Sequence, residues 1–272
     1  MTKNLDGEGL RSVFKNYDLF FIDLWGVVHN GIELYKEAVN VLAEISKSKK
    51  DFILLTNAPR PKKNVENFLK KMGLDKDKRE KVFTSGEAAL NFLKKKHLNH
   101  SFFHIGPPRD FDLFIDFKKN KTKEITKSDY LLCTGLFDDF DKDLNYYKEL
   151  LINCTSKKMI CTNPDLIVDR GRKREYCAGS VAMVFENLGG HVVYFGKPHS
   201  EVYNQSMEGN KKKIIAVGDN LRTDIKGANN MNYDSLFITD GIHKKEIQKE
   251  GIDNVLKKYD VKTTYYQSVL KW

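Results

Sequence analysis

The sequence predicts an α/β fold organised around a mainly parallel sheet. Short, wholly apolar runs, such as residues 19–22, 52–55 and 214–217, have the pattern of strands that are buried on both faces. Segments with a helical spacing of apolar residues lie between these runs, for example over residues 32–48. Each run ends near a polar side chain, and ligands bind in open α/β sheets beyond the carboxyl ends of the strands.

The first strand end carries Asp23. The apolar run Phe20-Phe21-Ile22 stops at this carboxylate, which is followed by Leu24-Trp25-Gly26 and, shortly after, by His29. Asp23 therefore sits at or just past the end of the predicted strand. Taken alone, it is equally well explained as a turn residue that closes the strand. Three further strand ends with polar chemistry favour a functional carboxylate.

The second strand end carries Thr56 and Asn57, directly after the run 52–55. Pro59 or Pro61 suits the first turn of a following helix. The hydroxyl of Thr56 and the backbone N–H groups of this turn can bind an anion at the helix N-terminus. The same residue types also form an ordinary N-cap, so this pattern has a purely structural explanation as well.

The third and fourth strand ends add a cation and two carboxylates. Lys197 follows the run 192–195, and Asp219 and Asp224 follow the run 214–217. Together the four strand ends supply a nucleophile, a hydroxyl donor, a cation and two hard oxygen ligands: Asp23, Thr56, Lys197, Asp219 and Asp224.

These four stretches, in this order, resemble the four motifs of the haloacid dehalogenase (HAD) superfamily of hydrolases. Cys161-Thr162-Asn163-Pro164-Asp165 and Gly218-Asp219, with Thr223-Asp224-Ile225, resemble its class IIA, and the likeness covers about residues 10–250. The resemblance implies a Rossmann-like parallel-sheet core with an inserted α/β cap of the class II (C2) type. The predicted domains are the N-terminal part of the core, the substrate-specificity cap and the C-terminal part of the core: residues 1–99, 100–190 and 191–272.

The resemblance also implies an activity: a Mg²⁺-dependent phosphatase that cleaves a small phosphorylated metabolite through an aspartyl-phosphate at Asp23. The implied metal ligands are Asp23, Asp219 and the backbone carbonyl of Trp25. Asp224 holds metal-bound waters and is counted among the catalytic residues, with Asp23, Thr56 and Lys197. The implied phosphate contacts are Thr56, Asn57 and Lys197. Asp165 and Arg170 are candidate substrate contacts from the cap, although each is at least as well explained as a turn residue or a surface ion pair.

Trp25 departs from the family pattern. Phosphatases of this superfamily usually read Asp-x-Asp in the first motif, whereas this chain resembles an uncharacterised class IIA subgroup that reads Asp-x-Trp-Gly. An indole only donates an N–H and cannot shuttle a proton, and loss of acid–base help costs about 10²–10⁴-fold in rate.

Three interpretations of Trp25 follow. His29 acts as the acid and base instead, although a loop or core histidine in a packing role is the more expected explanation at this position. Alternatively, the substrate has a leaving group that needs no proton, such as an acyl phosphate or a phosphoanhydride. In the third interpretation, the protein is a phospholigand-binding or regulatory pseudoenzyme.

Composition narrows the partners. The chain of 272 residues has a formal net charge of +9 and a pI of about 9.1. Most of the excess is Lys in short runs, which usually form solvated helix ends, so no nucleic-acid partner is expected. A positive field suits a small anionic substrate.

Location and assembly are expectations of the same kind. No apolar run approaches the roughly 18 residues of a membrane span, and residues 1–11 lack a signal-peptide core, so we expect a cytoplasmic protein without a membrane partner. The four cysteines form no Cys-x-x-Cys pair and are expected to be buried free thiols. The aromatic residues of the tail, 265–272, are expected to pack on the core or to form a homodimer contact.

Overall fold

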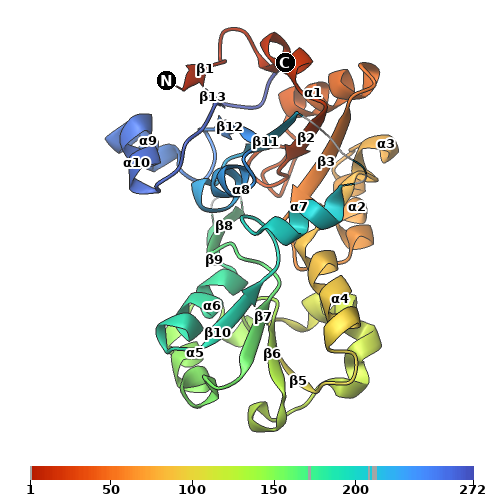
Figure 1. Ribbon diagram of the computed structural model, residues 1–272, viewed down its shortest axis with the longest axis vertical. Coiled ribbons are helices and arrows are strands. Elements are labelled where there is room, and N and C mark those ends of the chain that lie inside the picture. The colour runs from red at the N-terminus through yellow and green to blue at the C-terminus, as the bar shows by residue number, and fades with distance from the viewer. Residues whose placement is uncertain (1, 171–172, 208, 210–212) are drawn as a thin grey trace. The chain divides into compact units, whose positions relative to one another are not determined.

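The computed structural model describes residues 2–170, 173–207, 209 and 213–272, and the side chain of Arg170 lies outside that description. Its backbone forms two compact units, which Figure 1 shows along the chain from red to blue. The first unit comprises Met1–Thr56, Glu66–Phe83 and Ser206–Trp272. The second unit comprises Asn57–Val65 and Thr84–Gln205.

A seven-stranded sheet forms the centre of the first unit, in the order β1-β13-β12-β11-β2-β3-β4. The pairings from β1 to β3 are all parallel. Every residue of the central strands β2 and β11 is buried, as expected for a parallel sheet covered on both faces. The prediction of an α/β fold with a parallel sheet is therefore confirmed. In chain order the strands are β1 (Lys3–Asn4), β2 (Leu19–Ile22), β3 (Asp51–Thr56), β4 (Val82–Thr84), β11 (Ile214–Gly218), β12 (Asp234–Ile238) and β13 (Tyr265–Gln267).

The register of β2 and β11 brings two of the predicted strand ends together. Ile22 is the partner of Val217 in this parallel pair. The next N–H along β2, that of Asp23, donates to the carbonyl oxygen of Val217 at 2.9 Å. The residues that follow β2 and β11 therefore emerge side by side at one edge of the sheet.

Helix α1 begins later than the periodicity predicts. The apolar spacing favours a helix over residues 32–48, whereas α1 spans Lys36–Lys47. The Asn30 side chain accepts hydrogen bonds from the N–H groups of Ile32 and Glu33, both at 2.9 Å, which stabilises a turn in place of the first helical residues. The other α-helices are α2 (Lys62–Lys71), α3 (Lys76–Arg79), α4 (Ser85–Lys96), α5 (Leu144–Leu151), α6 (Ala178–Asn187), α7 (Ser200–Ser206), α8 (Lys226–Asn230), α9 (Lys244–Glu250) and α10 (Ile252–Lys258).

The C-terminal tail packs on the first unit. Strand β13 pairs with β12 on one side and with β1 on the other, so the predicted strand near residues 236–239 is not the last one. The Trp272 ring meets the Phe14 ring edge to face, with centroids 4.9 Å apart. A three-residue strand carries too little periodicity to be recognised from sequence.

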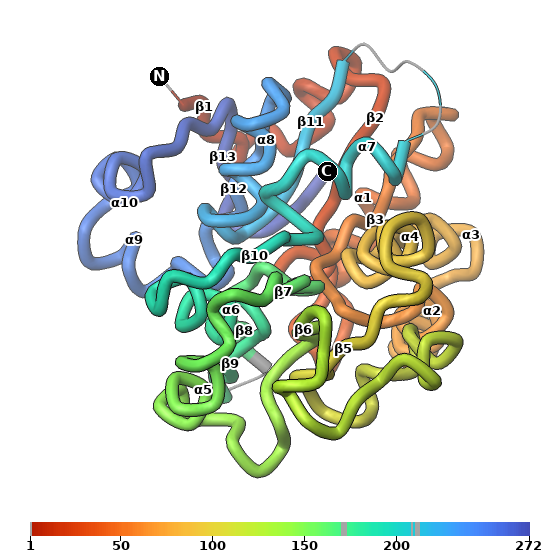
Figure 2. The backbone as a smooth tube through the Cα atoms, turned by 60° about the horizontal axis from the view of Figure 1, so that its bottom comes forward, coloured from red at the N-terminus to blue at the C-terminus, as the bar shows by residue number. Residues whose placement is uncertain are grey.

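The second unit has its own four-stranded sheet, in the order β10-β7-β6-β5, and all its pairings are parallel. In chain order its strands are β5 (Phe102–Ile105), β6 (Tyr130–Cys133), β7 (Lys158–Cys161) and β10 (His191–Tyr194). Figure 2 shows these four strands as neighbouring segments from yellow-green to teal. Two 3₁₀ stretches within Pro108–Asn120, separated by a kink at Phe114, follow β5, and the sequence pattern does not predict them.

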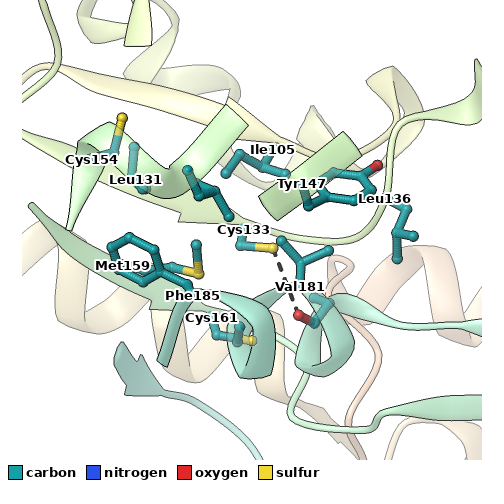
Figure 3. Packing of buried hydrophobic residues seen from close by; sticks show 13 residues of the cluster. Ile105, Leu131, Cys133, Leu136, Tyr147, Cys154, Met159, Cys161, Val181 and Phe185 are labelled. Carbon is teal, nitrogen blue, oxygen red and sulfur yellow. Dashed lines mark hydrogen bonds between the residues drawn. The ribbon is translucent and has the colours of Figure 1, made fainter. Parts of the chain in front are cut away.

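Figure 3 shows the buried cluster that holds this unit together, with Cys133 and Cys161 from adjacent strands facing Val181 and Phe185 of α6. All four cysteines are free and buried, so the prediction of buried thiols is confirmed. Burial raises the pKa of Cys133 to about 12, which keeps the thiol protonated and unreactive at neutral pH.

The predicted place of β10 is wrong. The sequence predicts a return to the first sheet from residue 191, but His191 pairs with Lys158 and Tyr194 with Cys161 in the second sheet. A short apolar strand has the same pattern in either sheet, so periodicity does not identify its neighbours. The domain boundaries at residues 99/100 and 190/191 otherwise stay a prediction.

An antiparallel hairpin is a further element that the sequence does not predict. It consists of β8 (Ile167–Arg170) and β9 (Lys173–Tyr176), and Arg174 Nε donates to Asp169 Oδ1 at 2.7 Å across it. Among the described residues, no helix is long and apolar enough to span a membrane.

We expect Gln267→Met to destabilise the first unit. The side chain keeps its length but loses a buried amide that donates to the carbonyl oxygens of Leu5 (3.2 Å) and Lys271 (3.3 Å). A buried acceptor left unsatisfied costs about 1–3 kcal/mol in the free energy of unfolding. Urea unfolding followed by circular dichroism measures the loss. Gln248→Met on the exposed face of α9 is the matched control, and equal midpoints for the two variants would contradict the prediction.

Candidate active site

Three carboxylates converge at the carboxyl ends of β2 and β11. One oxygen from each of Asp23, Asp219 and Asp224 lies within 4.8 Å of the other two, and all three residues are buried. Like charges this close repel one another unless a cation or a proton offsets them. Hard carboxylate oxygens are the protein ligands that Mg²⁺ prefers, so the donor set fits this metal.

Asp224 is held by a π-helical turn, Leu221–Ile225, that follows β11. The Asn220 side chain caps this turn by accepting a hydrogen bond from the Arg222 N–H (3.0 Å), and the Asn220 N–H donates to Asp224 Oδ2 (3.1 Å). Gly218 leaves the necessary room, because a Cβ there would lie 2.1 Å from Asp224 Cγ. π-helical turns are rare in proteins, and those that occur often lie at functional sites. The position of this turn, beside the carboxylate cluster, agrees with that tendency.

Asp219 is fixed by backbone from two other segments of the first unit. The Ile242 N–H donates to Asp219 Oδ2 at 2.8 Å. A Cβ on Gly26 or Gly241 would lie 2.1 or 2.0 Å from the same oxygen, so only glycine fits at either place. Sequence reasoning missed Gly241 and Ile242. The available signal was their position just past the strand predicted at residues 236–239, at the sheet edge that ligands use.

His29 is a packed side chain in the loop after Asp23. Its Nδ1 accepts a hydrogen bond from the Gly31 N–H at 3.0 Å. Its ring meets the Trp25 and Phe68 rings edge to face, with centroids 5.0 and 5.6 Å away. Burial lowers the pKa of His29 to about 4, so the imidazole is neutral at physiological pH. These contacts favour the packing role over the acid–base role.

Trp25 is half-buried, and Gly31 accommodates it. A Cβ on Gly31 would lie 2.6 Å from Cζ2 of the indole, and Gly31 has a φ of +88°, which disfavours any other residue. The loop also closes through its backbone, since the Gly26 N–H donates to the His29 carbonyl oxygen at 2.9 Å. The indole is therefore an ordered part of this loop.

Two more side chains of the first unit belong near the carboxylates. Thr56 is buried at the end of β3, the strand next to β2. Burial and the negative charge of Asp219 raise the pKa of Tyr35, so this phenol lies within electrostatic reach of the cluster and stays protonated. Sequence reasoning missed Tyr35 because it fell inside the predicted helix 32–48.

Asn57 and Lys197 lock together in the second unit. The Lys197 N–H donates to Asn57 Oδ1 at 2.7 Å, and Asn57 Nδ2 donates to the Lys197 carbonyl oxygen at 3.0 Å. Asn57 Nδ2 also donates to Asp165 Oδ1 at 3.3 Å. Gly196 has a φ of +118°, and a Cβ there would lie 2.6 Å from Asn57 Oδ1. Three predicted residues thus form one contact group.

The predicted site residues divide between the two units. The first unit carries Asp23, Trp25, His29, Thr56, Asp219 and Asp224. The second unit carries Asn57, Asp165 and Lys197, together with Arg170, whose backbone lies in β8 and whose side chain lies outside the described residues.

Two family models match the chain. Residues 20–117 match a model of haloacid dehalogenase-like hydrolases, and residues 194–261 match a HAD-hydrolase-like model. The 5'-nucleotidase YutF of Bacillus subtilis is 24% identical over 253 residues, which cover 88% of this chain and 93% of that protein. The acid sugar phosphatase of Staphylococcus epidermidis is 25% identical over 247 residues, with coverage of 88% and 93%.

A solved structure is more similar than these. It is a hydrolase of the haloacid dehalogenase-like family from Brucella suis, with 30% identity, a TM-score of 0.84, and coverage of 97% of this chain and 99% of that one. Its resemblance spans both units of the chain rather than a single motif. The chain belongs to the haloacid dehalogenase-like hydrolase family.

Proposed function

We propose that this protein is a Mg²⁺-dependent phosphatase of HAD class IIA that cleaves a small phosphorylated metabolite through an aspartyl-phosphate at Asp23. The observation that carries the proposal is the buried cluster of Asp23, Asp219 and Asp224 at the ends of β2 and β11. The names of the relatives as a nucleotidase and a sugar phosphatase support the reaction class. The motif Asp23-Leu24-Trp25-Gly26 supports a place in the Asp-x-Trp-Gly subgroup.

In the proposed reaction, a carboxylate oxygen of Asp23 attacks phosphorus, and the bond from phosphorus to the leaving oxygen breaks. Water then attacks the phosphorus of the acyl phosphate, releases inorganic phosphate and restores Asp23. Mg²⁺, held by Asp23, Asp219 and the Trp25 carbonyl with Asp224 beside its waters, would offset the negative charge of the carboxylates and substrate.

Cationic and N–H donors complete the proposed site. Thr56, the Asn57 N–H and Lys197 bind the phosphoryl oxygens, and these preorganised donors favour the charge that develops in the transition state. Lys197 is 4% exposed, so its ammonium needs an anion or polar partners close by. We further propose that residues 100–190 act as the cap, with Asp165 and Arg170 as substrate contacts.

The leaving group is the distinctive part of the proposal. Trp25 cannot shuttle a proton, and His29 is neutral and packed between aromatic rings. We therefore favour substrates whose leaving group departs without a proton, such as acyl phosphates, phosphoanhydrides or aryl phosphates. The same observations support a second candidate, a phospholigand-binding or regulatory pseudoenzyme. The proposal includes a cytoplasmic location and no nucleic-acid or membrane partner.

Asp23→Asn should abolish turnover. The amide is not a nucleophile toward phosphorus, so release of phosphate from acetyl phosphate and p-nitrophenyl phosphate should fall by about 10³-fold or more. Asp253→Asn, at an exposed position in α10, is the control and should match wild type. Wild-type rates in a folded Asp23→Asn protein would rule out the aspartyl-phosphate.

Mg²⁺ should raise the melting temperature of the wild-type protein, because a cation relieves the repulsion among three buried carboxylates. Asp219→Asn should abolish this rise, since an amide keeps the shape but is a poor ligand. Without metal, the variant should melt at or above the wild-type temperature, because one of three like charges is gone. Differential scanning calorimetry with EDTA or Mg²⁺ measures both effects. A wild-type protein that is insensitive to Mg²⁺ and active in EDTA would contradict the metal site.

Trp25→Asp should raise turnover of alkyl phosphates more than turnover of p-nitrophenyl or acetyl phosphate, because only the alkoxide needs a proton. The gain lies within the roughly 10²–10⁴-fold range of acid–base catalysis. His29→Gln should leave the ratio of alkyl to aryl turnover unchanged if His29 only packs. Rates, melting temperature and Mg²⁺ binding are measured together. A folded, metal-binding Trp25→Asp protein without any gain on alkyl esters would show that the missing acid does not limit the rate.

A further inference from the structure

We infer that His243 and Glu246 form a positioning pair that holds the metal-binding loop, residues 219–224, in its productive shape. The inference rests on the proposed function, because it assigns these residues to the same carboxylate cluster. Both lie in the first unit, at the start of α9 and far along the chain from β2 and β11.

His243 bridges the loop and Glu246. The Leu221 N–H donates to His243 Nε2 at 3.3 Å, and His243 Nδ1 lies 2.9 Å from Glu246 Oε2. A backbone N–H only donates, so Nε2 must be unprotonated and Nδ1 must carry the hydrogen. The imidazole therefore accepts from the loop on one side and donates to Glu246 on the other. His243 is 8% exposed, so water competes little for either contact.

Glu246 is itself fixed. Tyr259 Oη donates to Glu246 Oε2 at 3.0 Å, and Lys258 Nζ donates to Glu246 Oε1 at 2.5 Å. Burial alone would raise the pKa of Glu246, but the hydrogen bonds from Lys258, His243 and Tyr259 lower it to about 2. The carboxylate is therefore ionised over the whole physiological range and holds the His243 tautomer.

Two further contacts link the same elements to the loop. The Arg222 guanidinium lies over the Tyr259 ring, 4.7 Å from its centroid. Tyr259 also donates to Glu246, so it gives a second link between the loop and Glu246. Ile242, next to His243, donates its N–H to Asp219. Figures 1 and 2 show α9 and α10 as a pair of adjacent helices in the blue part of the chain. Val255 and Leu256 of α10 pack on Leu221 and Ile225.

This arrangement matches what a metal loop needs. Leu221 opens the π-helical turn that carries Asp224, so a fixed Leu221 N–H fixes the start of that turn. Hydrogen-bond partners outside the ligand shell orient metal ligands, and their loss typically lowers metal affinity or activity by about 10–100-fold. His243 and Glu246 therefore act on the carboxylate cluster through the backbone of the loop, at the Leu221 N–H.

The test is the Mg²⁺ affinity of the full-length protein, measured by isothermal titration calorimetry without substrate. His243→Leu fills most of the space of the imidazole but removes the hydrogen bonds to the Leu221 N–H and to Glu246. It should weaken Mg²⁺ binding about tenfold or more. His243→Gln retains an acceptor for the Leu221 N–H and should recover most of the affinity. Steady-state kinetics at saturating Mg²⁺ should show an unchanged KM for acetyl phosphate in both variants.

Val255→Ala is the matched control for a merely structural role. It opens a cavity in the same cluster without touching the hydrogen bonds, so it should lower the melting temperature and leave Mg²⁺ affinity unchanged. A His243→Leu protein that binds Mg²⁺ as wild type does, or a Val255→Ala protein that loses affinity equally, would overturn the inference alone. Wild-type protein that binds no Mg²⁺ would overturn the proposed function and this inference together.

Discussion

Three buried carboxylates held close together are the main constraint on the loops at the carboxyl edge of the first sheet. At 4.8 Å, two unit charges repel by about 3–4 kcal/mol at an effective dielectric constant of about 20. The surrounding chain does not relieve this repulsion by separating them. Instead it restricts the position of each carboxylate. The β2–β11 register fixes the backbone of Asp23, and the π-helical turn holds Asp224. The Ile242 N–H and the close approach of Gly26 and Gly241 hold Asp219. A cluster of carboxylate oxygens of this kind favours a small divalent cation, whose charge offsets the repulsion among the three side chains.

The sequence predicts the strands and the polar strand ends well because both depend on local chemistry. A wholly apolar run such as residues 214–217 marks a buried strand, and parallel packing then brings the ends of such strands to one edge. The sheet that a strand joins is harder to predict, because it depends on contacts between residues far apart in the chain. β10 joins the second sheet although its pattern suits either one, and β13 is too short to have a pattern. Ile242 contacts Asp219, and Leu221 contacts His243, through backbone N–H groups. Almost every residue type has such a group, so the residue type at these positions does not predict the contacts.

In the first motif alone, Trp25 stands out only as the replacement of the usual second aspartate. The structure shows that the surrounding loop also packs against the indole. Gly31 leaves room for the six-membered ring of the indole. The His29 ring meets the rings of Trp25 and Phe68, and its Nδ1 accepts a hydrogen bond from the Gly31 N–H. An aspartate at position 25 is smaller than the indole and would leave part of this space empty. The aromatic packing therefore couples Trp25, His29 and Gly31, and a single substitution at Trp25 tests chemistry and packing together.

Asn57 shows how a residue with a predicted catalytic contact can have a larger structural task. Its side-chain oxygen accepts from the Lys197 N–H, and its amide donates to the Lys197 carbonyl and to Asp165. With these hydrogen bonds made, the side-chain amide is committed to the second unit, and only the backbone N–H is available for the phosphate contact that we propose. Gly196 permits this close approach, because any side chain there would meet Asn57 Oδ1. The position of the Lys197 backbone is therefore set by a residue 140 positions away in the chain, which ties the third motif to the second by hydrogen bonds rather than by sheet pairing.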